Sequence, residues 1–495
     1  MEIPIDRKSA IPLHLQIAQA IRDRILTGAI PKEGRLPASR ALADALGVNR
    51  GTVTQAYQAL WSEGLIEGHV GRGTSVLSPG APPVAPLAPP SWETLLAGGA
   101  DPDDREIREF IRLIDREDLI SLAAGLPAPD LYPMDDLRAI TDDVLVREGR
   151  TLLHWCAVDG YAPLRRLLAA RFPGVSPGEV LVLSGSTQGI FLLARAMIAP
   201  GDLVAVQSPT YLGALQTFRA AGARVVGIPA GSEGIDLDML ESLFSRTRPK
   251  FFYVIPTFQN PTGATMSLDA RHGLLRLARR YGVPILEDDP YAPLRYDGEE
   301  VPTLKELDTH GHVLHLSTFS KILFPGFRVG WLAAPRPVVE SLKTGKHLQD
   351  LFTNSLGQAV ASEFMRRGLL DAHLRRVRVE YRARRDAMAK ALRRHAPRLS
   401  SASPQGGYFI WAKLPGGISA RELLRAALQK KVSFVHGDVF SPDGSGRDRI
   451  RINFASHAPE TIEEGVRRLG AALRAVRRRK KTDTREEGAS AKPIV

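Results

Sequence analysis

The pattern of apolar positions near the N-terminus predicts a small module of three helices. Apolar side chains recur at every fourth position, as on one face of a helix, at Leu13, Ile17, Ile21 and Ile25. The stretch "SRALADAL" predicts a short second helix that ends before Gly47, and Asn49 is placed to cap a third. The third helix is expected to pack inward through Val53, Tyr57 and Leu60. Two short strands around a glycine-rich tip, in "GLIEGHVGRGTSVL", would complete the module.

Farther along the chain, short apolar runs alternate with helical patterns. The expected strands are "EVLVLSG" (179–185), "LVAVQSP" (203–209), "KFFYVIP" (250–256), "PILEDD" (284–289) and "HVLHLST" (312–318). Helical patterns such as "GIFLLARAMIA" and "DARHGLLRLARRYG" lie between them. This alternation predicts a largely parallel sheet covered on both faces, with ligands bound beyond the carboxyl ends of its strands. Residues 371–396 are expected to form one long helix and residues 405–470 a smaller α/β region.

A break in composition separates the two parts. Residues 78–104 contain seven prolines, which cannot support a helix or a sheet interior. In a polyproline II conformation, residues 78–91 would span roughly 40 Å at about 3.1 Å per residue. We therefore expect two folded parts joined by a linker.

The bulk composition is typical of a soluble globular protein. The chain has 495 residues, too many for a single core, and is 44% hydrophobic and 24% charged. No apolar run approaches the roughly 18 residues needed to cross a bilayer. The N-terminal "MEIPIDRK" lacks the order of a signal peptide. The single cysteine, Cys156, excludes an intrachain disulfide, so a cytoplasmic location is expected.

The positive charge is unevenly distributed. The formal net charge is +12, and residues 371–400 alone hold ten basic and three acidic residues. The run "RRRKK" at 477–481 adds five more cations. One interpretation is a solvated amphipathic helix followed by a frayed tail. The other is an additional surface for phosphate groups, since a basic field raises affinity for nucleic acid without reading its sequence.

The motifs "LPASR", "GVNRGTV" and "GRGT" occur in order in the N-terminal module. Over residues 11–79 the module resembles the winged helix-turn-helix domain of the GntR family. The resemblance implies DNA contacts from Arg40, Arg50, Thr52, Gly71 and Arg72. A third helix in the major groove could present Arg50 to a guanine edge or a phosphate, and Arg72 in the wing suits a narrow minor groove. The alternative is a small helical domain that contacts protein.

In "STFSKILFPGFRVG" (317–330), hydroxyl side chains surround Lys321 and an arginine follows seven positions later. A lysine that forms a Schiff base must be neutral part of the time and must face a carbonyl. Pyridoxal 5'-phosphate (PLP) is such a carbonyl compound. Its phosphate needs N–H groups, hydroxyls and an arginine, its ring nitrogen needs a carboxylate, its phenolic oxygen needs donors, and its ring needs an aromatic lid.

Each of these needs has a candidate. The start of a helix in "SGSTQGI" offers Ser186 and Thr187 to a phosphate. Tyr211 suits the ring face, Asn260 the phenolic oxygen and Asp288 the ring nitrogen. The remaining candidates are Tyr291 for the phenolic oxygen, Thr318 and Ser320 beside the lysine, and Arg328 for the phosphate. Taken singly, each motif could be structural: "NPTG" a turn, "EDDPY" an acidic loop.

In this order the residues resemble the fold-type I aminotransferases of the aspartate aminotransferase superfamily, over residues 118–470. The resemblance implies an internal aldimine at Lys321, a carboxylate clamp at Arg451 in "DRIRINF", and a substrate-side loop at Gly125. From its strand alone, Arg451 could instead be a cation that pairs with an aspartate. Relatives usually carry a tyrosine where Trp155 stands, donated across a dimer interface to the neighbour's phosphate. That contact is therefore expected to be modified or lost.

The two resemblances together are those of MocR-type regulators. They imply a GntR-type domain (11–79), a proline-rich linker (80–117), a PLP-binding α/β aminotransferase-like domain with a small C-terminal α/β subdomain (118–470), and a basic disordered tail (471–495). They also imply a head-to-tail homodimer that binds double-stranded DNA and senses PLP or an amino compound through Lys321. No metal ligands and no membrane contact are assigned. A working aminotransferase with a DNA-binding appendage, or a DNA binder whose second domain has lost its cofactor, would be the alternatives.

Overall fold

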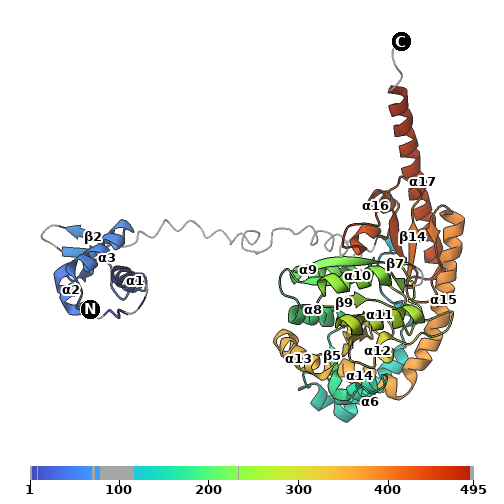
Figure 1. The fold of residues 1–495 in the computed structure, drawn as a ribbon, viewed down its shortest axis with the longest axis horizontal. Coiled ribbons are helices and arrows are strands. Elements are labelled where there is room, and N and C mark those ends of the chain that lie inside the picture. The colour runs from blue at the N-terminus through green and yellow to red at the C-terminus, as the bar shows by residue number, and fades with distance from the viewer. Residues whose placement is uncertain are drawn as a thin grey trace. The chain divides into compact units, whose positions relative to one another are not determined.

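The structure is a computed structural model that describes residues 3–7, 9, 11–69, 73–77, 116, 118–231 and 234–490, without the side chains of residues 69 and 480–490. The chain divides into two compact units, Met1–Gly99 and Ala100–Val495 (Figure 1). Gly71 and Arg72 of the expected wing lie outside the described residues, as does the expected linker apart from Arg116.

The first unit packs three helices against a small sheet. Its elements are α1 (Leu13–Leu26), β1 (Arg35–Leu36), α2 (Ser39–Leu46), α3 (Arg50–Ser62), β2 (Ile66–His69) and β3 (Gly73–Val76). Gly47 closes α2 in the left-handed conformation (φ 61°), and the Asn49 carboxamide oxygen accepts the Gly51 amide at 2.8 Å. The inward faces of α1 and α3 form one core, so the predicted helices are confirmed. The sequence did not predict β1, which pairs antiparallel with β3.

The second unit is built on an eight-stranded sheet in the order β5-β12-β11-β10-β9-β6-β7-β8. The strands are β5 (Val180–Leu183), β6 (Leu203–Ser208), β7 (Arg224–Gly231), β8 (Gly234–Ile235), β9 (Phe252–Val254), β10 (Ile285–Asp288), β11 (Val313–Thr318) and β12 (Gly330–Ala333). Only β12 and β8 run against the others in this sheet. The prediction of a largely parallel sheet is thus confirmed.

Helices cover both faces of this sheet, which explains the continuous apolar runs of its strands. In β5, Leu181 and Leu183 pack towards one set of helices, whereas Val180 and Val182 pack towards the other. The first set comprises α8 (Ser186–Met197), α9 (Leu212–Ala220) and α13 (Arg336–Asp350). The opposite face carries α6 (Met134–Leu152), α7 (Ala162–Ala169), α10 (Leu237–Thr247), α11 (Leu268–Tyr281), α12 (Leu304–Leu307) and α14 (Ser355–Arg366).

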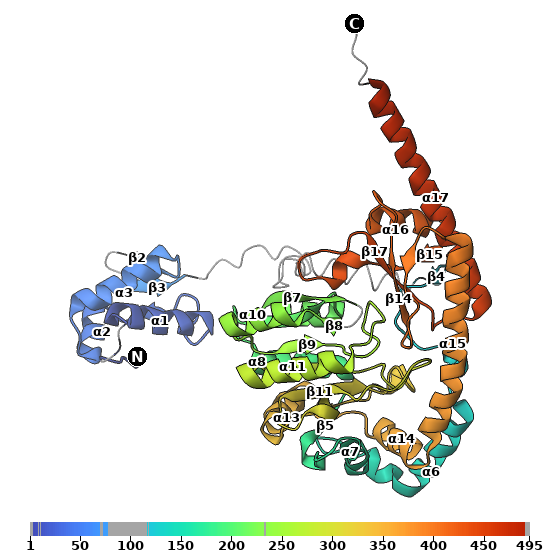
Figure 2. The ribbon, with the colours of Figure 1, turned by 45° about the vertical axis from the view of Figure 1, so that its right-hand side comes forward.

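A smaller α/β region follows the long helix α15 (Leu369–His395), as predicted (Figure 2). Its four-stranded sheet has the order β13-β14-β17-β16. The elements are β13 (Ser400–Ser401), β14 (Phe409–Lys413), α16 (Ala420–Gln429), β15 (Val432–Ser433), β16 (Val435–His436), β17 (Arg449–Asn453) and α17 (Pro459–Ser490). The first strand of the unit, β4 (Ile120–Ser121), pairs with β15 and so belongs to this region.

The disordered tail expected from residue 471 is corrected by the structure. Helix α17 continues to Ser490, and Leu473 and Val476 are buried. They extend the apolar face formed by Val466 and Leu469 earlier in the same helix, so the apolar period continues past the expected boundary. Within the described residues, no helix is both long and apolar enough to span a bilayer.

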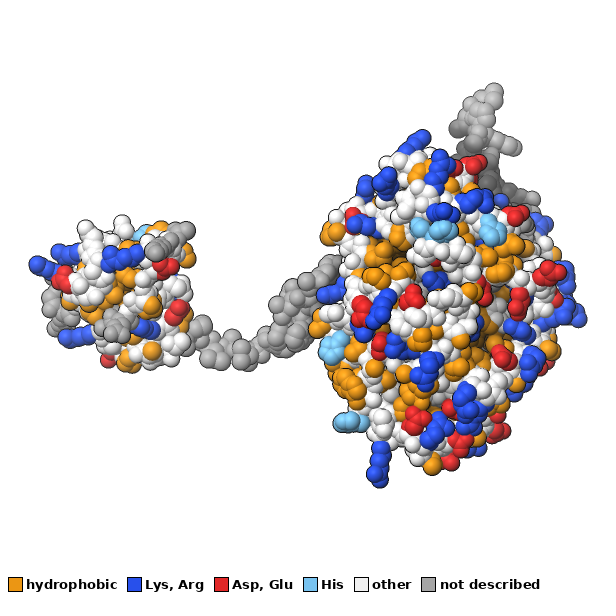
Figure 3. Space-filling view, turned by 60° about the horizontal axis from the view of Figure 1, so that its bottom comes forward, with side chains coloured by type: hydrophobic (Ala, Val, Ile, Leu, Met, Phe, Trp, Pro, Cys, Tyr) orange, Lys and Arg blue, Asp and Glu red, His pale blue; other side chains and the backbone are white. Residues whose placement is uncertain are grey.

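Many cations of the basic stretch in α15 hold the helix to its own unit. Arg384 bonds to Asp130 at 2.6 Å, Arg378 to the Pro293 carbonyl at 2.7 Å, and the buried Arg385 contacts Asp297. Figure 3 shows basic and acidic side chains intermixed on one face of this unit. The solvated-helix interpretation is therefore incomplete, and an additional phosphate-binding surface remains a prediction.

Candidate functional site

Lys321 lies just beyond the carboxyl end of β11, where the parallel strands of the large sheet terminate. Its side-chain amine donates a hydrogen bond to the Gly125 carbonyl at 2.7 Å. Burial, followed by the positive charges of Arg451 and Arg328, lowers the pKa of Lys321 to about 8, although Asp288 opposes this shift. Part of the amine is therefore neutral at physiological pH, as a lysine that attacks a carbonyl requires.

Asp288 ends β10, the strand beside β11. Its Oδ2 accepts a 2.6 Å hydrogen bond from the Tyr253 hydroxyl, while its Oδ1 is buried without a partner among the described residues. Burial raises the pKa of Asp288 to about 6. A buried acceptor without a donor is costly, so this oxygen fits a ligand that brings a protonated nitrogen. The ring nitrogen of PLP is such a group.

The end of the site expected to hold phosphate is formed at the start of α8. Gly185 precedes the helix with φ +92°, a backbone conformation that favours glycine. A Cβ at this position would lie 2.4 Å from Nη2 of Arg328, so only glycine allows the guanidinium to approach. That nitrogen donates to the Ser184 carbonyl at 3.2 Å. Ser186 and Thr187 occupy the first turn of α8, whose free N–H groups attract an anion.

The two hydroxyl residues before Lys321 are buried, and they contact each other. The Thr318 hydroxyl lies 2.9 Å from the Ser320 hydroxyl and 3.1 Å from the Val329 carbonyl. Thr318 therefore orders the turn that carries Lys321. Ser320 is the member of this pair that stands closer to the lysine in the chain.

Three further predicted residues converge near Arg451. Tyr211 caps α9, interacts with Thr187, and is held where a Cβ on Gly213 would overlap its ring. Burial raises the pKa of Tyr291, which keeps its hydroxyl protonated as a donor. The Asn260 carboxamide oxygen accepts a 2.8 Å hydrogen bond from Arg451.

Arg451 is buried in β17 without a carboxylate partner within the described residues. Its Nη2 donates to the Ala123 carbonyl at 2.7 Å, and its Nε has no partner in the same part of the chain. The guanidinium carbon lies 4.3 Å from the centre of the Phe409 ring and 5.0 Å from that of Phe440. Burial lowers the pKa of Arg451 to about 10. Since no aspartate of the described residues pairs with it, the guanidinium suits an incoming carboxylate.

The loop after β4 connects these groups. Three successive carbonyls, those of Ala123, Ala124 and Gly125, accept hydrogen bonds from Arg451, Asn453 and Lys321, respectively. A Cβ on Gly125 would lie 3.1 Å from the Phe409 ring, which limits the size of this residue. The expected loop glycine thus stands within the site.

Trp155 lies apart from the groups around Lys321. The residue is 52% exposed, and its ring packs edge-on against Phe352 with 5.0 Å between ring centres. Within the described residues it contacts none of the predicted cofactor residues. A contribution across a dimer interface stays a prediction.

The first unit presents its predicted DNA-contacting residues on α2 and α3. Arg40 lies on α2, while Arg50 and Thr52 lie in the first turn of α3. Arg40 and Arg50 are exposed and make no side-chain hydrogen bond within the described residues. An exposed helix start with unpaired arginines is the arrangement by which a recognition helix contacts DNA.

The comparisons with known proteins cover both units. Residues 117–469 match the family described as aminotransferase class I and II, and residues 13–76 match the gntR family of bacterial regulatory proteins. A Rhizobium meliloti protein named "Probable rhizopine catabolism regulatory protein MocR" is 30% identical over 489 residues, which are 95% of this chain and 96% of that protein. The chain belongs to the MocR-type family of transcriptional regulators.

The larger unit of this MocR-type regulator is also similar to enzymes. Aromatic-amino-acid aminotransferase 1 of Thermococcus litoralis is 40% identical over 380 residues, covering 74% of this chain and 91% of that protein. The crystal structure of LysN, an alpha-aminoadipate aminotransferase from Thermus thermophilus complexed with N-(5'-phosphopyridoxyl)-L-leucine, shares 37% identity and a TM-score of 0.72. That match covers 78% of this chain and 99% of LysN. The predicted fold is confirmed, and the GntR match implies DNA binding.

Several residues of the MocR-type site were not predicted from the sequence. Tyr253 bonds to Asp288, Asn453 bonds to the Ala124 carbonyl, and Phe440 faces Arg451. Of these residues, only Tyr253 gave a signal in the sequence, because it carries the lone hydroxyl in the otherwise apolar run "KFFYVIP".

Proposed function

We propose that this chain is a transcriptional regulator that binds double-stranded DNA through residues 11–79 and senses PLP, or an amino compound acting on it, through an aldimine at Lys321. The observation that carries the proposal is the buried, partnerless Oδ1 of Asp288 in the site that contains Lys321. A donor-bearing ring nitrogen would satisfy this oxygen. The DNA-binding module on the same chain gives the site a regulatory role rather than a purely metabolic one.

PLP would supply an aldehyde that condenses with amines and a ring that stabilises negative charge. The residues of this chain would bind and orient it. Asp288 would hold the ring nitrogen protonated, and Asn260 and Tyr291 would donate to the phenolic oxygen. The phosphate would lie at the start of α8, among Ser186, Thr187, Ser320 and Arg328, with Tyr211 over the ring.

Ligand binding would release the loop after β4. Lys321 cannot keep its hydrogen bond to Gly125 once its amine reacts, and a carboxylate on Arg451 competes with the Ala123 carbonyl and with Asn260. The same loop leads back through β4 to the linker of the DNA-binding module. A ligand that breaks these bonds would therefore favour another state of the loop, and the chain connection passes that preference towards the module.

A second function, slow transamination, is favoured by the similarity to aminotransferases and by the complete set of groups around Lys321. The lysine would then return as the base that moves a proton on a bound amino compound. Robust multiple turnover with a keto acid, together with no sequence-selective DNA binding, would favour this function over regulation.

We also propose that the larger units associate as a head-to-tail homodimer. Trp155 packs against Phe352, and apolar side chains near these two residues in the sequence, Leu153, Leu348 and Leu351, are 71%, 77% and 50% exposed. Surfaces of this kind are typical of subunit contacts. Sedimentation of the full chain tests the assembly, and Trp155→Ala is expected to weaken it.

The test of the main proposal combines cofactor capture with DNA binding. Purified chain incubated with PLP is expected to gain aldimine absorbance, and borohydride is expected to fix the cofactor at Lys321. Lys321→Ala should lose both signals. A chain that stays colourless, with no borohydride label at this position, would refute the sensing part while leaving DNA binding to the protein's own promoter region intact.

A further inference from the structure

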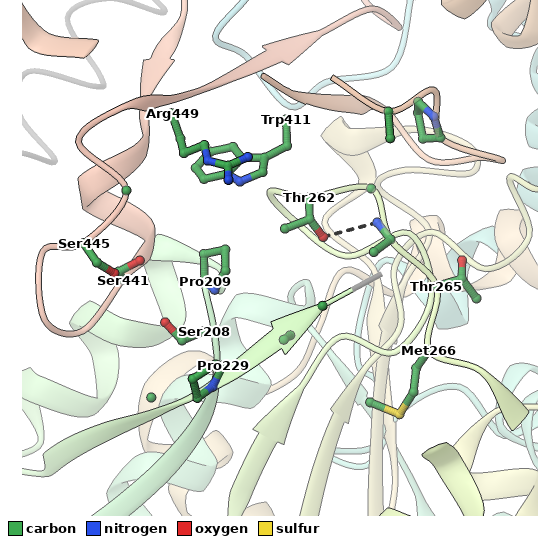
Figure 4. Close-up of a pocket in the computed structure, with 18 of the residues that line it drawn as sticks. Ser208, Pro209, Pro229, Thr262, Thr265, Met266, Trp411, Ser441, Ser445 and Arg449 are labelled. Atoms are coloured by element: carbon green, nitrogen blue, oxygen red, sulfur yellow. Dashed lines mark hydrogen bonds between the residues drawn. The ribbon is translucent and has the colours of Figure 1, made fainter. Parts of the chain in front are cut away.

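A large cavity lies between the small sheet and the carboxyl ends of β6 and β7, with a volume of about 1210 Å³ (Figure 4). Ser208 and Pro229 line it from the large sheet, and Thr262 to Met266 line it from the loop after Asn260. Trp411 and Arg449 line it from the small sheet. Lys321, Asp288 and Arg451 do not line it, so the cavity is separate from the proposed cofactor site.

Arg449 and Arg451 lie on the same face of β17, because side chains two residues apart on a strand point to the same side. Trp411 of β14 pairs directly with Arg451 and is the diagonal neighbour of Arg449. Arg451 donates to Asn260 and Ala123, as described above. The Arg449 guanidinium makes no hydrogen bond within the described residues, and the Asp448 carboxylate is 3.8 Å away. Figure 4 shows Arg449 and Trp411 on one wall of the cavity.

The other walls are rich in hydroxyl groups. Within the described residues, no side-chain hydrogen bond engages the hydroxyls of Ser208, Ser400, Ser401, Ser403 and Ser441, all of which line the cavity. Among the described residues, Asp443 is the one carboxylate of the lining, and its Oδ1 accepts the Ser445 amide at 3.0 Å. The lining therefore offers one guanidinium whose N–H groups are free of hydrogen bonds within the described residues, one flat aromatic side chain and many hydroxyls. These groups suit a ligand that has one anionic end and a polar body.

We propose that this cavity binds a small hydroxylated organic anion. Its carboxylate or phosphate lies on Arg449, and its hydroxyl-bearing skeleton lies against Trp411 and the serine-rich walls. A guanidinium binds either anion through a fork of N–H groups.

The cavity shares walls with the proposed effector site. The Trp411 ring packs edge-on against Phe440 with 5.7 Å between ring centres, and Phe440 also faces Arg451. Ser208 and Pro209 come directly before the segment that carries Tyr211, and Thr262 follows Asn260 by two residues. A ligand in the cavity thus lies beside the carboxylate clamp, on the same face of the small sheet. Its occupancy biases how the regulator responds to its first effector.

Calorimetric titration of the full chain with three probes tests the site: gluconate, glucose 6-phosphate and uncharged glucose. Both anions are expected to bind, and glucose is expected to bind at least about tenfold more weakly. The relative affinities of gluconate and glucose 6-phosphate show whether the cavity prefers a carboxylate or a phosphate. Arg449→Met is expected to weaken both anions by about tenfold or more. Arg447→Met removes the same charge from an exposed neighbour that does not line the cavity, and should leave binding unchanged.

Two further variants keep the test decisive. Ser445→Trp places a large ring in the cavity from an exposed position and should abolish anion binding even if Arg449→Met fails to fold. Lys321→Ala should retain anion binding, because the cavity does not use the lysine, so failure of the cofactor proposal is distinguishable. If neither anion binds the wild-type chain at millimolar concentration, or if Arg449→Met and Ser445→Trp bind as tightly as wild type, the cavity site is refuted.

Discussion

The side-chain amine of Lys321 donates a 2.7 Å hydrogen bond to the Gly125 carbonyl, 196 residues earlier in the chain. This bond joins the reactive group of the proposed site to the first loop after β4. It uses an N–H group of the free amine, which is lost when the nitrogen forms a double bond to carbon. Chemistry at Lys321 and the position of the loop are therefore linked through one hydrogen bond.

Capture of PLP by Lys321 should depend on pH in a way set by its lowered pKa. Only the neutral amine attacks an aldehyde, and its fraction rises with pH up to the pKa of about 8. The capture rate is expected to rise about tenfold per pH unit below that value and to level off above it. Arg451→Met removes the positive charge that, after burial, lowers the pKa of Lys321 most, so the pH profile of capture in this variant should move to higher pH. Stopped-flow absorbance measures both profiles, and a rate still rising steeply at pH 10 would contradict a lowered pKa.

Asp288→Asn should weaken PLP binding by about tenfold or more, because an amide cannot stabilise a protonated ring nitrogen. Tyr253→Phe is the matched control. It removes only the donor to Oδ2 and leaves Oδ1 and its charge in place, so a smaller loss is expected. Absorbance titration gives both dissociation constants. Equal affinity of wild type and Asp288→Asn would show that this carboxylate does not hold the ring.

The sequence was sufficient where side-chain identity and local period carry the information. The strands before Asp288 and Lys321 were predicted from apolar runs bounded by Gly, Pro or Asp, and the caps at Gly47 and Asn49 follow from residue type. The parallel order of the strands follows from the helices between them. These features involve neighbours in the chain.

Contacts made by backbone carbonyls across long separations could not be predicted. The carbonyls of residues 123–125 hold three side chains more than 190 positions away, and any residue type supplies a carbonyl. Strand β12 was not predicted. It runs antiparallel to both of its partners, β5 and β11, and its own short apolar run does not indicate this direction. The Thr318 hydroxyl bonds to the Ser320 hydroxyl in its own turn and to the Val329 carbonyl, and only coordinates can distinguish that use from a ligand contact.

Arg50→Ala should weaken binding to the protein's own promoter region by about 1–3 kcal/mol if Arg50 contacts a base edge. Its PLP absorbance should stay that of wild type, because Arg50 lies in the other unit. Arg138→Ala is the matched control, since it removes a charge that is 82% exposed on α6. Fluorescence anisotropy at several salt concentrations measures binding. If Arg50→Ala and Arg138→Ala weaken promoter binding equally, Arg50 contributes to DNA binding only through its positive charge and not through a base contact.

Glu287 precedes Asp288 in β10, and we expect it to stabilise the fold of the larger unit. Its carboxylate is fully buried, accepts the amides of Leu304 at 2.7 Å and Lys305 at 3.0 Å, and lies 2.8 Å from His315. Glu287→Ala would leave these groups unpaired and is expected to lower the free energy of unfolding by about 3–5 kcal/mol. Glu300→Ala removes an exposed carboxylate and should change the free energy of unfolding by less than about 1 kcal/mol. Chemical denaturation of both variants tests the difference.

Asn453→Ala should separate ligand capture from the DNA response. The Asn453 amide bonds to the Ala124 carbonyl and, at 2.8 Å, to the Ser456 hydroxyl, but it makes no bond to Lys321 or Asp288 in the described part of the chain. The variant should therefore still gain PLP absorbance, while its loop has lost one of its three carbonyl contacts and is looser before ligand arrives. Hydrogen exchange of residues 120–127 should be fast in the variant with or without PLP, and should quicken in wild type only when PLP is added. Promoter affinity should then respond to PLP in wild type and lose most of that response in the variant. A variant with an unchanged DNA response would show that the signal leaves the site by another route.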